Sequence, residues 1–430
     1  MLGTLTARLN KSIFVKNVVL LAGGTAASQI IVSLSSPVVT RLYTPADYGV
    51  FTVFTAAVGI IGQLSTLRYS VPIALADNEE LADNLLRLCF LITLSLSVLF
   101  GAVVFLFGDF VATKLSVLEA KRYFWLFPVC LLGTGFYETL SGWAVRRKDF
   151  KTIARTKLSQ GASSSLVKMC LGWLGVRPLG LLLGLLVSQA AGSGSLFLRL
   201  AKEKASLLRR ISWSGVANAA KRYYAFPLLQ APSRLLLTLG VQLPAVVMAS
   251  FYGAKAAGLF GLAHGMVNMP MNLMGVSVAQ AYYAEIARYG KSRPDKILTL
   301  SISIIKNMFL LSIIPMGAII IAGPWLFSFV FGAQWHDAGN YARSLSIMIV
   351  IRFISTPIMH CLDVLEKQSL QLSLNIIRVL FVLLIFKLCV HFGFSSRMAI
   401  HFYSIVFSLF YAFVIAIVFK FLFSMKHQPA

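Results

Sequence analysis

Seven basic side chains lie inside apolar stretches of this 430-residue chain that are long enough to cross a bilayer. They are Arg68, Lys168, Arg234, Lys306, Arg352, Arg378 and Lys387, and Glu138 is the one acid placed clearly within such a stretch. A charge near the middle of a bilayer costs a few kcal/mol on insertion scales, and such residues usually face a cavity or pathway. Because ion pairing cannot neutralise this set, an anionic ligand is favoured. Guanidinium groups bind phosphate oxygens through paired hydrogen bonds, so the arginines indicate a phosphate.

Polar residues on the same stretches recur at helical spacing. Residues three or four positions apart share one face of a helix, so each series forms a polar stripe. The series are Gln29, Ser33, Ser36 and Thr40; Gln160, Ser164 and Lys168; Gln230, Arg234, Thr238 and Gln242; Arg352, Thr356 and His360; and Gln368, Gln371, Asn375 and Arg378. Such stripes suit a water-filled cavity better than a lipid-facing surface. Their hydroxyl and amide groups suit a ligand rich in sugar.

The stripes and the basic residues together predict one cationic substrate-binding cavity. Its basic candidates are Arg68, Lys168, Arg234, Lys306, Arg352 and Arg378, and its polar lining is Gln29, Gln230, Gln242, Gln371 and Asn375. Lys306, Lys387 and Arg68 lie near the ends of their stretches, where a long basic side chain can instead reach the lipid headgroups. For Glu138 the sequence leaves two roles open. It could couple transport to H⁺ or Na⁺, or it could form an ordinary ion pair with Arg146.

Membrane helices are the expected scaffold for these residues. Hydrophobic residues make up 58% of the chain and charged residues only 13%, against about 25% charged in an ordinary soluble domain. Apolar runs separated by polar breaks predict an all-α polytopic membrane protein with twelve transmembrane helices. The predicted spans are Asn17–Thr40, Tyr48–Ser70, Asn84–Phe107, Tyr123–Trp143, Ile153–Gly175, Leu179–Leu198, Phe226–Phe251, Ala256–Tyr283, Leu300–Gly323, Tyr341–Leu362, Ser369–His391 and Met398–Ser424.

The basic residues also predict the orientation of the chain. Of the 39 Lys and Arg residues, 24 fall on the side that carries both termini and 8 on the other. Loops on the cytoplasmic side of a membrane are enriched in Lys and Arg, so both termini are predicted to be cytoplasmic. Much of the formal net charge of +24 therefore follows from topology. Nucleic acid is not an expected partner, because no long basic soluble domain is present.

The chain is predicted to consist of two parallel six-helix lobes, residues 1–198 and 226–430, joined by a basic connector at 199–225. The connector sequence from Arg199 to Arg222 mixes basic residues with Leu and Trp and is expected to lie on anionic membrane lipid. The segment from Tyr43 to Phe51 aligns with the segment from Tyr252 to Phe260, with Tyr, Gly and Phe identical. Both segments join the first and second helices of a lobe. Repeats of this kind are typical of alternating-access transporters with a site between the halves.

Several catalytic motifs are absent from the sequence. There is no phosphate-binding loop of the GxxxxGK[ST] type, no HExxH, no nucleophile elbow, and the six histidines are dispersed. We therefore expect no cofactor, no metal and no enzymatic activity.

Four segments resemble a known family, and one of them is Tyr252–Gln280, with Gly258, Pro270 and Gln280, which is similar to the eighth helix and its entry. Arg41–Phe51, with its Pro45, Tyr48 and Gly49, is similar to the segment that follows the first helix in bacterial polysaccharide-biosynthesis, or O-antigen (Wzx-type), flippases. Leu67–Leu75 resembles the end of the second helix, and Arg147–Ala154 the basic start of the fifth. This family belongs to the multidrug/oligosaccharidyl-lipid/polysaccharide (MOP) exporter superfamily, which also contains the MATE transporters. Ser70 stands where family members often carry Glu, which argues against a carboxylate role there.

The resemblance implies a flippase that moves undecaprenyl-pyrophosphate-linked oligosaccharide across the bacterial inner membrane by alternating access. It also implies a polysaccharide polymerase and a chain-length regulator as partners, and it places Arg68, Arg234, Arg352 and Arg378 in a central cavity. Two alternatives remain from the sequence. One is a cation-coupled small-molecule exporter of the same superfamily, and the other is an integral-membrane glycan polymerase or glycosyltransferase.

Overall fold

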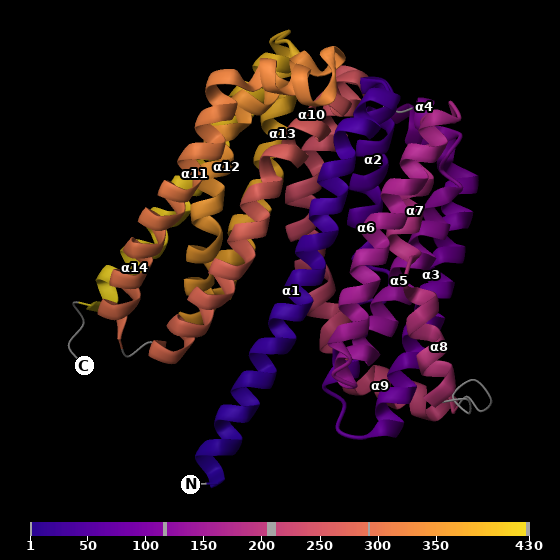
Figure 1. The fold of residues 1–430 in the computed structure, drawn as a ribbon, viewed down its shortest axis with the longest axis vertical. Coiled ribbons are helices and arrows are strands. Elements are labelled where there is room, and N and C mark those ends of the chain that lie inside the picture. The colour runs from indigo at the N-terminus through magenta and orange to yellow at the C-terminus, as the bar shows by residue number, and fades with distance from the viewer. Residues whose placement is uncertain (1, 115–117, 204–211, 291–292, 427–430) are drawn as a thin grey trace. The chain divides into compact units, whose positions relative to one another are not determined.

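A computed structural model describes residues 2–114, 118–203, 212–290 and 293–426, and within these ranges the chain is helical with no β-strand (Figure 1). Its elements are α1 (Leu2–Leu42), α2 (Pro45–Gly62), η1 (Pro72–Ala74), α3 (Glu79–Lys114), α4 (Leu118–Lys121), α5 (Leu126–Arg146), α6 (Phe150–Trp173), α7 (Leu179–Ala190), α8 (Ser193–Glu203), α9 (Trp213–Arg222), η2 (Phe226–Gln230), α10 (Ala231–Tyr289), α11 (Pro294–Phe331), η4 (Ala333–Trp335), α12 (His336–Val364), α13 (Gln368–His391) and α14 (Ser396–Lys426).

The all-α membrane class predicted from the composition is confirmed. Over the described part of the chain, eight helical segments are long and apolar enough to cross a membrane, and the longest of them, Phe226–Tyr289, is broken at Gly253. The chain is therefore a multi-pass membrane protein. Each predicted span overlaps a helix. The count of twelve crossings and the side on which the termini lie stay predictions.

The chain packs into two compact units. Unit 1 comprises residues 1–43 and 53–242, and unit 2 comprises residues 44–52 and 243–430. Residues 226–242 thus pack with unit 1, whereas the sequence-based division at residues 198 and 226 follows the predicted order of spans. The division of the chain into lobes at residues 1–198 and 226–430 stays a prediction.

Unit 1 is built on pairs of neighbouring helices. α6 packs along α1 and α7, and α5 packs along α3 and α7. A buried apolar cluster that includes Leu85, Leu140 and Trp143 also takes up Leu196 and Leu200 of α8 and Ala219 of α9. The short amphipathic helices α8 and α9 therefore bury their apolar faces against unit 1, which follows from their apolar residues recurring at helical spacing.

The second predicted span was too long. α2 ends at Gly62, and residues 63–71 form successive turns instead of continuing the helix to Ser70. Leu67 and Arg68 have φ values of 46° and 65°, in the left-handed region that L-residues seldom adopt. The hydrophobic periodicity continues through this segment, so the sequence pattern does not predict the end of α2 at Gly62. Arg68 consequently sits on an irregular segment rather than on a helix.

The sixth predicted span and the connector also differ in detail. Leu179–Leu198 is divided into α7 and α8 at two residues, because Ala191 is extended and Gly192 has a φ of 86°. The predicted connector from Arg199 to Arg222 comprises the end of α8 and all of α9. Its central residues 204–211, which include Lys204, Arg209 and Arg210, lie outside the described residues.

Unit 2 consists of the second part of α10, α11, η4, α12, α13 and α14, together with the start of α2. α11, α12 and α14 pack on one another, and α13 packs against α12 and α14. Within α10, Gly253 has φ 83° and ψ 172°, so two helices meet there at a kink. This break lies between the predicted seventh and eighth spans, and it corresponds to the break that separates α1 from α2.

The two repeated sequence segments pack directly on each other in unit 2. α2 begins with a reciprocal cap, since the backbone N–H of Thr44 donates to the Asp47 carboxylate at 2.9 Å and the Asp47 N–H donates to the Thr44 hydroxyl at 3.2 Å. One turn later Gly49 crosses Gly258. A Cβ at Gly258 would lie 2.7 Å from the backbone nitrogen of Gly49, and one at Gly49 would lie 2.9 Å from the Cα of Ala254. Only glycine at both positions permits this approach.

Candidate functional site

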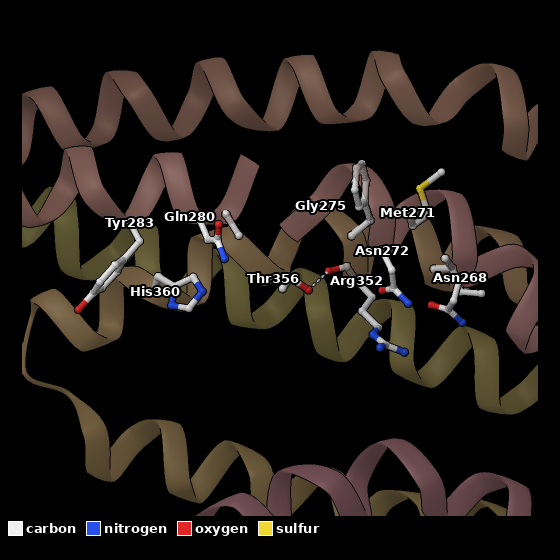
Figure 2. Close-up of a pocket in the computed structure, with 12 residues that line it drawn as sticks. Asn268, Met271, Asn272, Gly275, Gln280, Tyr283, Arg352, Thr356 and His360 are labelled. Carbon is white, nitrogen blue, oxygen red and sulfur yellow. Dashed lines mark hydrogen bonds between the residues drawn. The ribbon is translucent and has the colours of Figure 1, made fainter. Parts of the chain in front are cut away.

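Unit 2 contains a cavity of about 420 Å³ between the second part of α10 and α12 (Figure 2). α10 supplies Asn268, Met271, Asn272, Gly275, Ala279, Gln280 and Tyr283, and α12 supplies Ile349, Arg352, Phe353, Thr356 and His360. Pockets of this size hold drug-sized ligands. The lining contains one permanent positive charge, five amide, hydroxyl or imidazole side chains besides Tyr283, and no acid.

The α12 stripe lies in this cavity. Arg352, Thr356 and His360 recur every fourth residue and therefore line it together, and the Thr356 hydroxyl donates to the Arg352 carbonyl at 2.8 Å. Figure 2 shows the polar ends of Arg352 and Asn272 pointing to the same side. The His360 and Tyr283 rings lie side by side, with 5.4 Å between their centroids. His360 Nδ1 also lies 3.1 Å from a carboxylate oxygen of Asp363, a residue that does not line the cavity. An anionic group at Arg352 would have amide donors next to it.

Arg378 of α13 is buried in the same unit. Its side chain is 7% exposed, its guanidinium carbon lies 5.7 Å from the centroid of the Tyr411 ring, and its Nε has no hydrogen-bond partner. Tyr403 of α14 lies within electrostatic range of both Arg378 and Arg352. Among the described residues neither arginine makes an ion pair with a carboxylate. Arg378 is thus buried beside an aromatic ring without a carboxylate partner among the described residues. Asn375, which is buried, lies one turn before it.

Four polar residues of this cavity were missed in the sequence. Asn268, Asn272, Gln280 and Tyr283 lie on the Met-rich part of α10, where the run of methionines around Pro270 favours simple packing. The signal was present, because Asn268 and Asn272 are four residues apart and Gln280 is eight residues further on. This is the same helical spacing that identified the other stripes.

Unit 1 holds the lone acid of the predicted spans. Glu138 on α5 accepts hydrogen bonds from Ser65 at 3.4 Å and from Thr66 at 3.3 Å, both in the turns that follow α2. Arg68, on the same turns, is within electrostatic range of Glu138 and its Nε has no hydrogen-bond partner. The early end of α2 therefore brings two hydroxyls and a basic residue around one carboxylate.

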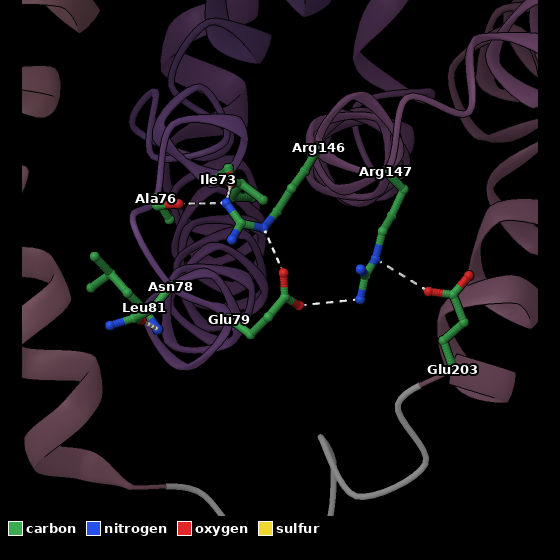
Figure 3. Close-up of polar contacts among 8 residues, drawn as sticks. All are labelled: Ile73, Ala76, Asn78, Glu79, Leu81, Arg146, Arg147 and Glu203. Carbon is green, nitrogen blue, oxygen red and sulfur yellow. Dashed lines mark hydrogen bonds and ion pairs between the residues drawn. The ribbon is translucent and has the colours of Figure 1, made fainter.

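The alternative pairing of Glu138 with Arg146 is wrong. Arg146 Nε meets Glu79 at 3.1 Å, and its NH1 donates to the carbonyl of Ala76 at 2.6 Å (Figure 3). Glu79 also meets Arg147, which in turn meets Glu203 at 3.3 Å. Glu79 begins α3 and the two arginines end α5, so the helix ends bring these charges together. Glu138 lies about two turns before Arg146 in α5, and its hydrogen-bond partners are Ser65 and Thr66 instead.

The remaining candidates fall into two groups. Lys168 and Gln242 contact other helices of unit 1, since the Lys168 stem packs on Gly184 of α7 and the Gln242 amide packs on Gly59 of α2. The others are exposed or half-buried: Gln29, Gln230, Arg234, Lys306 and Gln371. The structure brings Arg352, Thr356 and His360 into one cavity and buries Arg378 in the same unit, outside that lining. That the unit 1 candidates share a cavity with them stays a prediction.

Residues 38–340 match the sequence model of a family described as polysaccharide biosynthesis protein. The chain belongs to this polysaccharide biosynthesis family. A curated relative, the teichuronic acid biosynthesis protein TuaB of Bacillus subtilis (strain 168), is 24% identical over 137 residues. That match covers 32% of this chain, and the chain spans only 28% of the length of the relative.

Solved structures place this member of the polysaccharide biosynthesis family in the MOP fold. An inward-facing multidrug resistance MATE transporter of the MOP superfamily superimposes with a TM-score of 0.76 at 17% identity, covering 94% of this chain and 96% of that one. The lipid II flippase MurJ, in an inward closed conformation, gives 0.65 at 13% identity, covering 96% and 94%. The resemblance recognised in the sequence is therefore confirmed for family and fold.

Proposed function

We propose that this protein is a flippase that moves a lipid-linked oligosaccharide from the inner to the outer leaflet of the bacterial cytoplasmic membrane. The substrate class is an undecaprenyl-pyrophosphate-linked unit of a surface polysaccharide, and the mechanism is alternating access. The proposal is supported by membership in the polysaccharide biosynthesis family and by the MOP fold.

The observation that carries the proposal is the chemistry of the unit 2 cavity. Arg352 lines it with amides and hydroxyls, Arg378 is buried in the same unit, and no acid lines it. A guanidinium offers two parallel N–H groups to a pyrophosphate, and amide and hydroxyl groups match the hydroxyls of a sugar. The polyprenyl tail would stay in the bilayer, so only the polar head needs the cavity. No covalent bond is made or broken in this scheme.

Export of such a head group can be driven by the membrane potential. Moving one charge across 100 mV is worth about 2.3 kcal/mol. A doubly charged pyrophosphate leaving a negative interior would therefore gain roughly twice that amount. A fixed arginine in the cavity offsets the cost of moving this charge through the low-dielectric membrane.

Glu138 is the candidate for coupling to an ion. It is half-buried, and the hydroxyls of Ser65 and Thr66 that contact it are groups that also coordinate Na⁺. We expect Glu138→Gln to abolish any stimulation of flipping by a proton or Na⁺ gradient and to leave potential-driven flipping intact. Stimulation of equal size in the variant would remove Glu138 from this role.

The two rival activities predict different chemistry. A cation-coupled exporter of cationic drugs needs acids in its cavity, whereas the lining of the unit 2 cavity has none. A glycan polymerase or glycosyltransferase forms glycosidic bonds, so incubation with lipid-linked glycan would lengthen the product. We expect unchanged glycan on the opposite leaflet. A polysaccharide polymerase and a chain-length regulator are proposed partners, and anionic lipid is proposed to contact the basic connector.

The experiment is complementation of a bacterial strain that lacks its own flippase for the same polysaccharide. We expect Arg352→Gln to lower surface polysaccharide at least tenfold at equal protein level, since a charged hydrogen bond to phosphate contributes about 1.5–3 kcal/mol. Lys387→Gln, which removes an equal charge at an exposed position of α13, is the matched control and should export normally. Full export by Arg352→Gln would count against the cavity assignment.

A further inference from the structure

A second cavity of unit 2, of about 440 Å³, lies between α11, α12 and α14. Its lining shares no residue with the cavity around Arg352. It consists of a polar group, made of Asn340, Arg343, Ser344, Arg397 and His401, and an apolar group, made of Ile320, Ile347, Met398 and Phe402. Nothing in the proposed transport cycle uses it.

The polar group carries two positive charges and no lining acid. Arg397 donates to the Asn340 side chain at 3.2 Å, and Arg343 donates one guanidinium N–H to the Ile321 carbonyl at 2.8 Å. The Nε of Arg343 has no hydrogen-bond partner. Over the described residues, neither arginine meets a carboxylate within 4.0 Å. The outer guanidinium N–H groups of these two lining arginines can therefore donate to an acceptor that enters the cavity.

The backbone adds to the positive character of this site. α12 begins at His336 and α14 at Ser396, so Asn340 and Arg397 lie near the N-terminal, positive ends of these two helices. Asp337 is an exposed acid in the first turn of α12, one turn before Asn340 and outside the lining. The groups that face the cavity from all three helices are therefore basic or neutral.

Two members of the apolar group, Ile347 and Phe402, lie further along their helices than the arginines. Ile347 follows Arg343 by one turn of α12, and Phe402 follows Met398 by one turn of α14. Ile347 is 58% exposed, and the exposed side chains of Phe402, Ile405 and Leu409 continue along α14. The surface thus changes from basic to apolar over about two turns. That polarity matches a phospholipid, whose charged phosphate sits above its acyl chains.

We propose that this cavity binds an anionic phospholipid, with the phosphate at Arg343 and Arg397 and one acyl chain along Ile347 and Phe402. By the predicted orientation the lipid belongs to the outer leaflet. The site is independent of the proposed flippase activity, because it shares no residue with the cavity around Arg352. Long basic side chains can also reach lipid headgroups at any membrane surface, but that contact requires neither a cavity nor a neighbouring apolar surface. Both are present here.

The test is a binding titration of the purified, delipidated full-length protein in neutral detergent. The probes are short-chain phosphatidylglycerol, the matching phosphatidylcholine, and inorganic phosphate. We expect one site at which phosphatidylglycerol binds at least about tenfold more tightly than phosphatidylcholine, while inorganic phosphate binds weakly. Equal binding of both lipids, or inorganic phosphate binding as tightly as phosphatidylglycerol, would overturn the proposal.

The variants separate this site from general attraction to a basic protein. Arg343→Gln with Arg397→Gln should weaken phosphatidylglycerol binding about thirtyfold, which corresponds to about 2 kcal/mol. Lys255→Gln with Lys387→Gln removes the same charge from exposed positions of unit 2 and should change it less than about threefold. Equal loss in both pairs would mean a nonspecific charge effect and would refute the site.

Two single variants test the same site in case the double variant does not fold. Arg397 is exposed, so Arg397→Gln alone should fold and should weaken binding about fivefold. Ile347→Ser should weaken binding of the lipid and leave that of inorganic phosphate unchanged, because only the lipid has an acyl chain. Unchanged lipid binding in both single variants would contradict the proposed pose.

Discussion

The crossing of Gly49 and Gly258 gives the sharpest prediction about packing, because three of the glycines of α10 differ in how closely other atoms surround them. A Cβ at Gly258 would meet the backbone around Pro45, and backbone cannot move aside. A Cβ at Gly261 would lie 2.7 Å from the Thr52 methyl, a side chain with some freedom. A Cβ at Gly265 would meet nothing within 4 Å. Alanine substitutions should therefore differ strongly along one helix.

We expect Gly258→Ala to lower the free energy of unfolding by about 3 kcal/mol or more, the upper range for overpacking. Gly261→Ala should lower it by about 1–2 kcal/mol, and the second change Thr52→Ala should restore part of that loss. Gly265→Ala should raise stability by about 0.5–1 kcal/mol, since alanine loses less backbone entropy than glycine in a helix. All three substitutions add the same methyl group to the same helix, so the variants differ only in what surrounds that group.

The assay is thermal unfolding of each purified variant in the same detergent, followed by loss of the monomer peak in size-exclusion chromatography. The predicted order of midpoints is Gly265→Ala, wild type, Gly261→Ala and Gly258→Ala, from highest to lowest. Midpoints of Gly258→Ala and Gly265→Ala within a degree of each other would refute the close approach of α10 to α2.

Two further predictions concern polar contacts within one unit. Glu79→Gln removes the ion pairs to both Arg146 and Arg147. Because the Glu79 side chain is 51% exposed, we expect the free energy of unfolding to fall by about 1 kcal/mol or less, and the difference to disappear in high salt. A fall of more than about 3 kcal/mol in thermal unfolding would contradict this. The buried Tyr282 hydroxyl meets Ser301 at 2.6 Å, and Tyr282→Phe should cost about 1–2 kcal/mol; a stability equal to wild type would show that this contact contributes nothing.

The fold class was predictable because composition decides it. Continuous apolar runs with few charges have one stable solution in a bilayer, which is a set of helices that satisfy their own backbone. The breaks inside those runs were less predictable. Arg68 follows an apolar series that fits a helix, yet α2 ends at Gly62 because tertiary contacts of the turns, such as Glu138 with Thr66, outweigh local preference. Gly192 and Gly253 mark breaks that depend on a positive φ, which many glycines do not adopt.

The candidate site was predictable in part for a similar reason. Spacing identifies the face of a helix, so Arg352 and His360 were placed on one stripe and line one cavity. Spacing does not identify what that face meets. Lys168 belongs to an equally regular stripe, yet its stem packs against Gly184 of α7. Distinguishing a cavity from a helix contact requires the partner helix, and that information lies far away in the sequence.

The central claim is that an acid-free, arginine-lined cavity handles the pyrophosphate of a lipid-linked glycan. The most direct measurement is flipping of a defined glycan by purified protein in proteoliposomes, with the same glycan and lipid joined through pyrophosphate or through a neutral linker. The wild type should flip the pyrophosphate form faster, more so with an imposed potential, and Arg352→Gln should lose that preference while Lys387→Gln keeps it. Equal rates for the two linkers in the wild type, or an unaltered preference in Arg352→Gln, would contradict the claim.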